Sequence, residues 1–125
     1  MTRIKNLFTK ILLISLFTTS FSKASGIEII NLRSEYTETP LGIDVTNPRF
    51  SWQMTSEKAG CYQTAYQIIV VDENGQKVWD SSKKQSDISL NIKYAGTPLK
   101  PSLRYNWQVF VWDQNHKKAR STIIF

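Results

Sequence analysis

Hydrophobic and polar positions alternate most regularly in the stretch 103–111. Its odd positions carry Leu, Tyr, Trp, Val and Val, whereas positions 104, 106 and 108 carry Arg, Asn and Gln. A period of two in β-branched and aromatic residues is typical of a half-buried β-strand. The stretch therefore predicts a strand whose inner face, including Tyr105 and Trp107, packs in a core.

Six other short segments have the pattern or composition of strands. Residues 63–71 are the most apolar part of the chain after residue 26, and their β-branched side chains favour a central strand over a helix. The Asn74-Gly75 pair that follows predicts a hairpin turn. No segment after residue 26 has the period of a helix. The predicted strands are 27–33, 47–54, 63–71, 77–80, 88–92, 103–111 and 121–125.

About seven short strands separated by turn residues predict an all-β immunoglobulin/fibronectin-III-like Greek-key β-sandwich. Pro101 and Tyr105 have the spacing of a tyrosine corner, in which the hydroxyl bonds back to the chain that enters the strand. Trp52 and Trp107 are the expected central residues of the core, and each indole N–H needs a partner once buried. We expect structural roles for these four residues.

The first residues predict a leader rather than part of the domain. Arg3, Lys5 and Lys10 precede an apolar run at 11–17, and Ser22-Lys-Ala24 fits a small-x-small cleavage site. This layout is typical of a secretory signal peptide, and the run is too short to span a bilayer. The alternative is an uncleaved amphipathic N-terminus. We expect a signal peptide at 1–24, a sandwich at 25–125, and export to the periplasm or the extracellular space without a membrane anchor.

The end of the chain is apolar, with Ile-Ile-Phe at 123–125. This ending predicts that the last strand is truncated. A short last strand would leave the strand at 103–111 partly unpaired, and unpaired edges invite aggregation.

Charge argues against a nucleic-acid partner. The chain has 16 Lys and Arg residues, and loss of the four in the leader leaves 12 against 10 Asp and Glu, a net charge of +2 instead of +6. Nucleic-acid binding needs cations clustered on one face. The doublets Lys83-Lys84 and Lys117-Lys118 are separate and fall in predicted loops, where solvation explains them.

The composition predicts no catalytic, cofactor-binding or metal-binding residue. Cys61 is the only cysteine and His116 the only histidine, so an internal disulfide is excluded and a zinc site is not expected. Cys61 has no visible base beside it, and we interpret it as a passive thiol. No phosphate-binding glycine loop is present. Asp80 and Asp113 each follow a Trp and are interpreted as caps at strand ends rather than as acids.

One feature goes beyond a simple fold. If Tyr105 and Trp107 face the core, then Phe110 and Trp112 point away from it, and Ile69 and Val71 point the same way from the segment 63–71. An outward apolar patch suggests a docking surface. Two alternatives remain open, namely that neighbouring loops cover Trp112 and that the aromatic rings form a sugar-stacking platform.

Seven short motifs occur in a fixed order along the chain. They are Asn31-Leu-Arg33, Pro40-Leu-Gly-Ile-Asp44, Pro48-Arg-Phe-Ser-Trp52, Gln63-Thr-Ala-Tyr-Gln-Ile68, Val78-Trp-Asp-Ser81, Tyr105-Asn-Trp-Gln-Val109 and Val111-Trp-Asp113. This ordered set resembles the N-terminal fibronectin-III/immunoglobulin-like domain of bacterial α-L-rhamnosidases, secreted enzymes of glycoside hydrolase family 78. In that family the catalytic carboxylates lie in a downstream (α/α)6 barrel. The resemblance therefore implies no catalytic residue at any position here.

Two functions from different classes follow from these observations. The first is a non-catalytic accessory β-sandwich of an exported α-L-rhamnosidase-like enzyme, whose partners are the other domains of that enzyme. The alternative is a free-standing carbohydrate- or protein-binding module of the cell envelope, with a rhamnosylated glycan as its partner. Neither function needs a cofactor.

Overall fold

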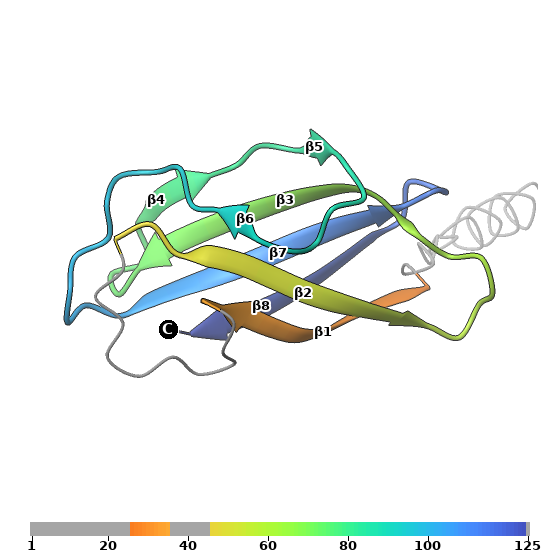
Figure 1. Cartoon of the computed structure of the whole chain (residues 1–125), viewed down its shortest axis with the longest axis horizontal. Helices are drawn as coiled ribbons and strands as arrows, with labels where there is room; N and C mark the ends of the chain where they lie inside the picture. Colours follow the sequence, from red (N-terminus) through yellow and green to blue (C-terminus); the bar gives the residue numbers. More distant parts are fainter. Residues whose placement is uncertain (1–25, 36–45, 125) are drawn as a thin grey trace, which may run out of the picture.

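The chain forms a β-sandwich of two antiparallel sheets (Figure 1). The computed structural model describes residues 26–35 and 46–124, without the side chains of 122–124. The predicted signal peptide at 1–24, the segment 36–45 and Phe125 lie outside the described residues.

Eight strands make up the described part of the two sheets. The first sheet has the order β1-β2-β6, with strands β1 (Ile27–Ser34), β2 (Arg49–Ser56) and β6 (Ile92–Lys93). The second sheet has the order β4-β3-β7-β8, and β5 also pairs with β3; its strands are β3 (Gln63–Asp72), β4 (Lys77–Asp80), β5 (Lys84–Gln85), β7 (Tyr105–Asp113) and β8 (Lys118–Ile124). The predicted fold class is confirmed, with one more strand than expected.

The strand predicted from the most regular alternation, β7, lies at the centre of the second sheet. It pairs with β3 from Gln63↔Asp113 to Asp72↔Tyr105 and with β8 from Asn106↔Ile124 to Trp112↔Lys118. The expectation that β7 would be partly unpaired is therefore wrong along these seven β8 pairs. β8 begins at Lys118 instead of 121, because the turn closes where the Asp113 N–H donates to the Lys117 carbonyl oxygen at 3.0 Å.

The predicted strand at 88–92 is also wrong, because only its last residue belongs to a strand. Ile88 and Leu90 are 55% and 61% exposed, and Asn91 has a left-handed backbone with φ of 58°. The segment crosses from the second sheet to the first. In this segment the Ser89 carbonyl oxygen accepts a hydrogen bond from the backbone N–H of Trp52 at 2.9 Å. Its alternation of apolar and polar residues therefore does not correspond to a buried face.

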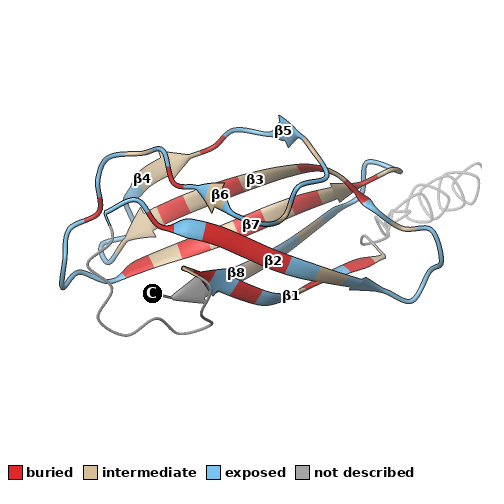
Figure 2. Cartoon of the chain, viewed as in Figure 1, coloured by how far each residue is buried: buried red, intermediate tan, exposed pale blue. Residues whose placement is uncertain are grey.

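Buried positions lie along the strands of both sheets (Figure 2). The core that they form between the sheets consists mainly of aromatic and β-branched side chains. Trp107 is fully buried, and its ring lies 4.6 Å from that of Phe50 between centroids. Trp52 donates its indole N–H to Gln63 Oε1 at 3.0 Å. Trp107 Nε1 has no hydrogen-bond partner within the described residues. The expectation that a buried indole finds a partner therefore holds for Trp52 and fails for Trp107.

The tyrosine corner forms at the start of β7. The hydroxyl of Tyr105 accepts a hydrogen bond from the Lys100 N–H at 2.9 Å, and Leu99 beside it is buried. Pro101 is exposed in the turn between them. The corner fixes the angle at which the chain enters β7, and so it also fixes which side chains of β7 face outward.

Candidate functional site

The outward side of the second sheet is set by the alternation along β7. Tyr105, Trp107, Val109 and Val111 are buried in the core, whereas the side chains between them are half-buried. We call the side that carries these intermediate residues the outer face. On β7 it consists of Asn106, Gln108, Phe110 and Trp112.

Lysine side chains cover the two outward aromatic rings. The Lys83 ammonium, from the connection between β4 and β5, lies 4.5 Å from the ring centroid of Trp112. Lys118, the first residue of β8, lies 4.9 Å from the Phe110 ring and 5.8 Å from the Trp112 ring. Each contact is a cation–π interaction, which is worth about 0.5–1 kcal/mol at an exposed site. Trp112 is therefore covered in part by a residue of a neighbouring loop.

Arg120 completes a group that we call the basic aromatic strip. It is exposed and lies directly across from Phe110 in the pairing of β7 with β8. A shallow hollow of about 330 Å³ opens between Phe110, Lys118 and Arg120. The strip consists of Lys83, Phe110, Trp112, Lys118 and Arg120.

The two β3 residues predicted for this face lie on it but away from the aromatic rings. Ile69 pairs with Gln108 and Val71 with Asn106, and both apolar side chains are half-buried. Directly opposite Phe110 stands Gln67, whose amide donates to Asp80 Oδ1 at 2.8 Å. The structure thus places all four predicted residues on the outer face. The polar residues Gln67, Asn106 and Gln108 lie among them on the same face.

Asp80 lies at the β4 edge of the outer face, and its carboxylate accepts hydrogen bonds. The Gln67 amide and the Ser82 N–H hold the pKa of this carboxyl below its ordinary value, and Lys77 contributes further, against a smaller effect of burial. The Lys77 ammonium lies 3.2 Å from Asp80 Oδ2. These contacts make Asp80 an ionised cap at a strand end, not a proton donor.

Asp113, Cys61 and His116 lie together near the turn after β7. Asp113 is buried, and its Oδ1 accepts from the N–H groups of Asn115 and Lys117 at 2.8 and 2.9 Å. The thiol of Cys61 lies 3.9 Å from Asp113 Oδ2, and His116 is exposed in the turn. Within the described residues, no group of three His, Cys, Asp or Glu side chains could hold a metal ion. The same part of the chain has no helix with the length and apolar character to cross a bilayer.

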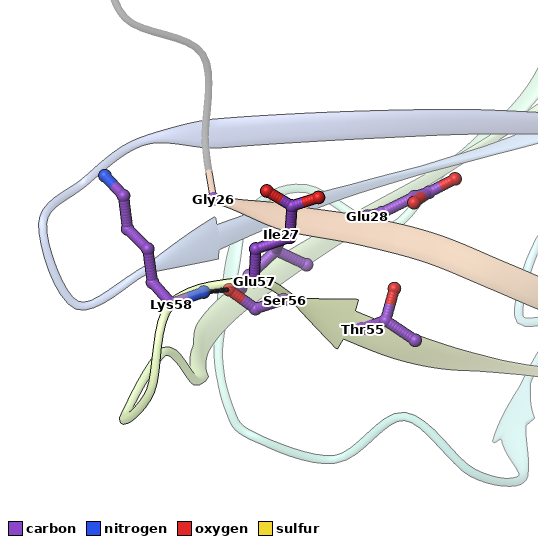
Figure 3. A pocket seen from close by; sticks show the side chains of 7 residues that line it. All are labelled: Gly26, Ile27, Glu28, Thr55, Ser56, Glu57 and Lys58. Atoms are coloured by element: carbon purple, nitrogen blue, oxygen red, sulfur yellow. Dashed lines mark hydrogen bonds between the residues drawn. The ribbon is translucent and has the colours of Figure 1, made fainter.

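A hollow of about 490 Å³ lies at one end of the first sheet, where β1 begins and β2 ends (Figure 3). The Lys58 ammonium and the Glu28 carboxylate lie at its opposite ends. Its one drawn hydrogen bond runs from the Lys58 N–H to Ser56 Oγ at 3.1 Å and belongs to the turn itself. Glu57 also lines the hollow, and its carboxylate lies between the Lys58 and Glu28 groups in this view.

The most exposed large apolar side chains are Tyr62, which the sequence did not single out, and three residues that were wrongly predicted to lie in strands, namely Ile88, Leu90 and Leu103, the last of which precedes β7. Tyr62 and Leu103 are 59% and 41% exposed, and Ile88 and Leu90 lie on the crossing segment described above. The polar residues Asp87, Ser89 and Asn91 alternate with Ile88 and Leu90 as they would in a half-buried strand, so the sequence held no signal that this segment is solvated.

Comparison with known proteins places this fold in a family. The family model described as "Rha78A-like, N-terminal immunoglobulin domain" matches residues 29–124. The chain belongs to this family of N-terminal immunoglobulin domains. The resemblance inferred from the ordered motifs is confirmed.

Relatives of this immunoglobulin domain are α-L-rhamnosidases. The chain is 44% identical over 93 residues to the α-L-rhamnosidase of Streptomyces avermitilis, and 38% identical over 86 residues to one from Formosa agariphila. These alignments cover 71% and 64% of the chain but 9% of each relative. The chain thus spans about a tenth of the length of the curated relatives that it matches.

Solved structures agree with the sequence comparison. The S. avermitilis α-L-rhamnosidase complexed with L-rhamnose has a TM-score of 0.69 at 40% identity, covering 77% of this chain and 10% of that one. The enzyme from Dictyoglumus thermophilum has a TM-score of 0.70 at 37% identity, covering 82% of this chain and 12% of that one. In these homologues the domain is one part of a multidomain rhamnosidase.

Proposed function

We propose that the chain is the non-catalytic accessory β-sandwich of an exported α-L-rhamnosidase-like glycoside hydrolase, and that it packs against and supports the enzyme's other domains. The observation that carries this proposal is the family match over residues 29–124, which corresponds to about a tenth of each relative. The basic N-terminus and apolar run at 11–17 support export to the periplasm or the extracellular space.

The side chains described above agree with a supporting role. Near the outer face, Asp80 caps a strand end, and Lys83 and Lys118 lie against the aromatic rings. A sheet face with half-buried aromatic residues is a common place for another domain to pack.

The proposal is tested by mixing the chain with the S. avermitilis α-L-rhamnosidase from which its own N-terminal immunoglobulin domain has been removed. We expect association measurable by calorimetry, and no hydrolysis of an aryl α-L-rhamnoside by the chain alone. We also expect the DNA after the Phe125 codon to encode rhamnosidase domains. Hydrolysis by the chain alone would overturn the non-catalytic assignment, and absence of association would overturn the packing role.

The alternative function, a free-standing carbohydrate- or protein-binding module of the cell envelope, is favoured by Phe110 and Trp112 on the outer face. Aromatic rings at a surface can stack on a sugar. This alternative predicts that millimolar L-rhamnose or a rhamnosylated glycan changes the fluorescence of Trp112. No change at those concentrations would remove it.

A further inference from the structure

The basic aromatic strip carries three cations that lack a carboxylate partner. Lys83, Lys118 and Arg120 are exposed, and none of them forms an ion pair within the described residues. The ion pair on the same sheet, Lys77 with Asp80, lies at the β4 edge. Among the residues that the structure describes, the β8 side of the outer face therefore carries cations without a paired carboxylate.

The two lysines of the strip are held in place before any partner arrives. A free lysine side chain loses rotamer freedom when it forms an ion pair, and this loss cancels much of the gain. Here the rings of Phe110 and Trp112 already fix the ammonium groups of Lys118 and Lys83 at 4.5–5.8 Å. Because each ammonium has its ring on one side, its other side is available for an anion.

The strip also has an apolar centre. Phe110 lines the hollow of about 330 Å³ together with Lys118, Ala119 and Arg120. Aromatic and arginine residues are enriched at the centres of protein interfaces, and complementary charge around such a centre sets orientation and partner choice. An apolar side chain flanked by carboxylates matches this arrangement in both shape and charge.

We propose that the basic aromatic strip is a docking surface for an acidic patch with an apolar centre on a neighbouring domain of the same enzyme. This inference rests on the proposed function and adds the face and the charge of the contact. Carboxylates of the partner pair with Lys83, Lys118 and Arg120, while an apolar side chain seats against Phe110.

The observations favour a protein over a sugar at this surface. Stacking of a sugar on Trp112 requires an open ring face, and the Lys83 ammonium lies over that ring. An acidic protein surface needs no such displacement, since it binds the lysines where they already lie. Sugar binding is therefore an outcome of the test, and it would count against the inference.

The test compares two double charge reversals of the whole chain. Lys118→Glu with Arg120→Glu changes the strip, and Lys58→Glu with Lys93→Glu makes the same change in net charge at two exposed residues outside it. Each protein is titrated with the S. avermitilis α-L-rhamnosidase that lacks its N-terminal immunoglobulin domain. Circular dichroism first establishes that both variants remain folded, and the strip variant is expected to lose only the small stability, about 0.5–1 kcal/mol per contact, that the Lys118 cation–π contacts provide.

We expect the strip reversal to raise the dissociation constant at least about tenfold, because like charges placed opposite each other oppose docking. The control should change it by less than about twofold, and about 500 mM salt should weaken the wild type far more than the strip variant. Equal affinities for both variants would overturn the inference and leave the proposed function standing. Failure of the wild type to bind would overturn both, and competition by L-rhamnose would assign the strip to sugar instead.

Discussion

The side chain of Gln63 forms three hydrogen bonds, one to the opposite sheet and two to the segment that crosses between the sheets. It is 3% exposed, and its Oε1 accepts from Trp52 Nε1 on β2 at 3.0 Å. Its Nε2 donates to the carbonyl oxygens of Ser86 and Ile88, both at 2.9 Å. A buried amide with all these partners satisfied holds the crossing segment against the core, and its loss would leave several buried polar groups unpaired.

Replacement of Gln63 by Leu is therefore expected to lower the free energy of unfolding by about 2–4 kcal/mol. Gln63→Glu should also be destabilising, because a carboxylate retains the acceptor for Trp52 but cannot donate to Ser86 and Ile88. Urea unfolding measures both, with Gln76→Leu on the exposed hairpin as a control expected to stay within about 0.5 kcal/mol. A Gln63→Leu protein as stable as the wild type would contradict this role.

Asp80 makes the free energy of unfolding depend on pH. Hydrogen bonds from Gln67 and Ser82 lower its pKa in the folded protein relative to the unfolded chain, where an Asp titrates near about 3.9. A lowered folded pKa adds stability above the unfolded value, and this stability is lost as the pH falls through the folded value. Asp80→Asn should reduce stability near neutral pH and show a smaller further loss in acid. Urea midpoints measured between about pH 6 and pH 2.5 test this, and parallel curves for the two proteins would argue against it.

At the scale of elements, strand bounds were predicted well for most short apolar segments, including β4, whose burial does not alternate. β4 was predicted at its observed bounds, and β3 and β7 within two residues. The segment 88–92 has equally clean alternation but is a crossing connection. A period of two shows only that successive side chains point to opposite sides. It does not say whether another sheet covers either side, and that depends on contacts with Trp52 and Gln63 far away in the sequence.

The crossing segment therefore leads to a prediction that separates the two interpretations. Ile88→Ser together with Leu90→Ser is expected to change the free energy of unfolding by less than about 0.5 kcal/mol, because both side chains are mostly exposed. A buried strand would instead lose several kcal/mol. Ile68→Ser on β3, which is fully buried, provides the comparison and should cost about 3 kcal/mol or more. A large loss in the double variant, measured by urea unfolding, would restore the strand.

Gly96 packs so closely against Tyr94 and against Trp79 of β4 that a larger residue does not fit there. A Cβ at Gly96 would lie 2.6 Å from the Tyr94 hydroxyl oxygen and 2.7 Å from Trp79 Cβ. The Trp79 and Tyr94 rings form an edge-on pair with centroids 5.1 Å apart. Gly96→Ala should force the two rings apart and lower the free energy of unfolding by about 1–3 kcal/mol, which lowers the thermal midpoint. Gly26→Ala, whose added carbon would meet ordinary contacts from 3.5 Å, is the matched control and should leave the midpoint unchanged.

At the scale of the whole molecule, the sequence predicted the two aromatic residues of the outer face but not the charges that define it. Lys83-Lys84 and Lys117-Lys118 were interpreted as solvated doublets because they are separate in the sequence and fall in predicted loops. The sheet brings Lys83 and Lys118 to the same pair of rings, through the pairing of Trp112 with Lys118 and the loop that returns from β4. Only the folded arrangement shows that one lysine of each doublet belongs to the same surface.

We propose that this sandwich supports the other domains of an α-L-rhamnosidase-like enzyme. The most direct measurement is the thermal unfolding midpoint of the S. avermitilis α-L-rhamnosidase in three forms: intact, without its N-terminal immunoglobulin domain, and with residues 27–124 of this chain in place of that domain. We predict that the hybrid recovers most of the midpoint lost on deletion and unfolds in one transition. A hybrid that unfolds at the midpoint of the deleted enzyme, with the inserted sandwich melting separately, would contradict the claim.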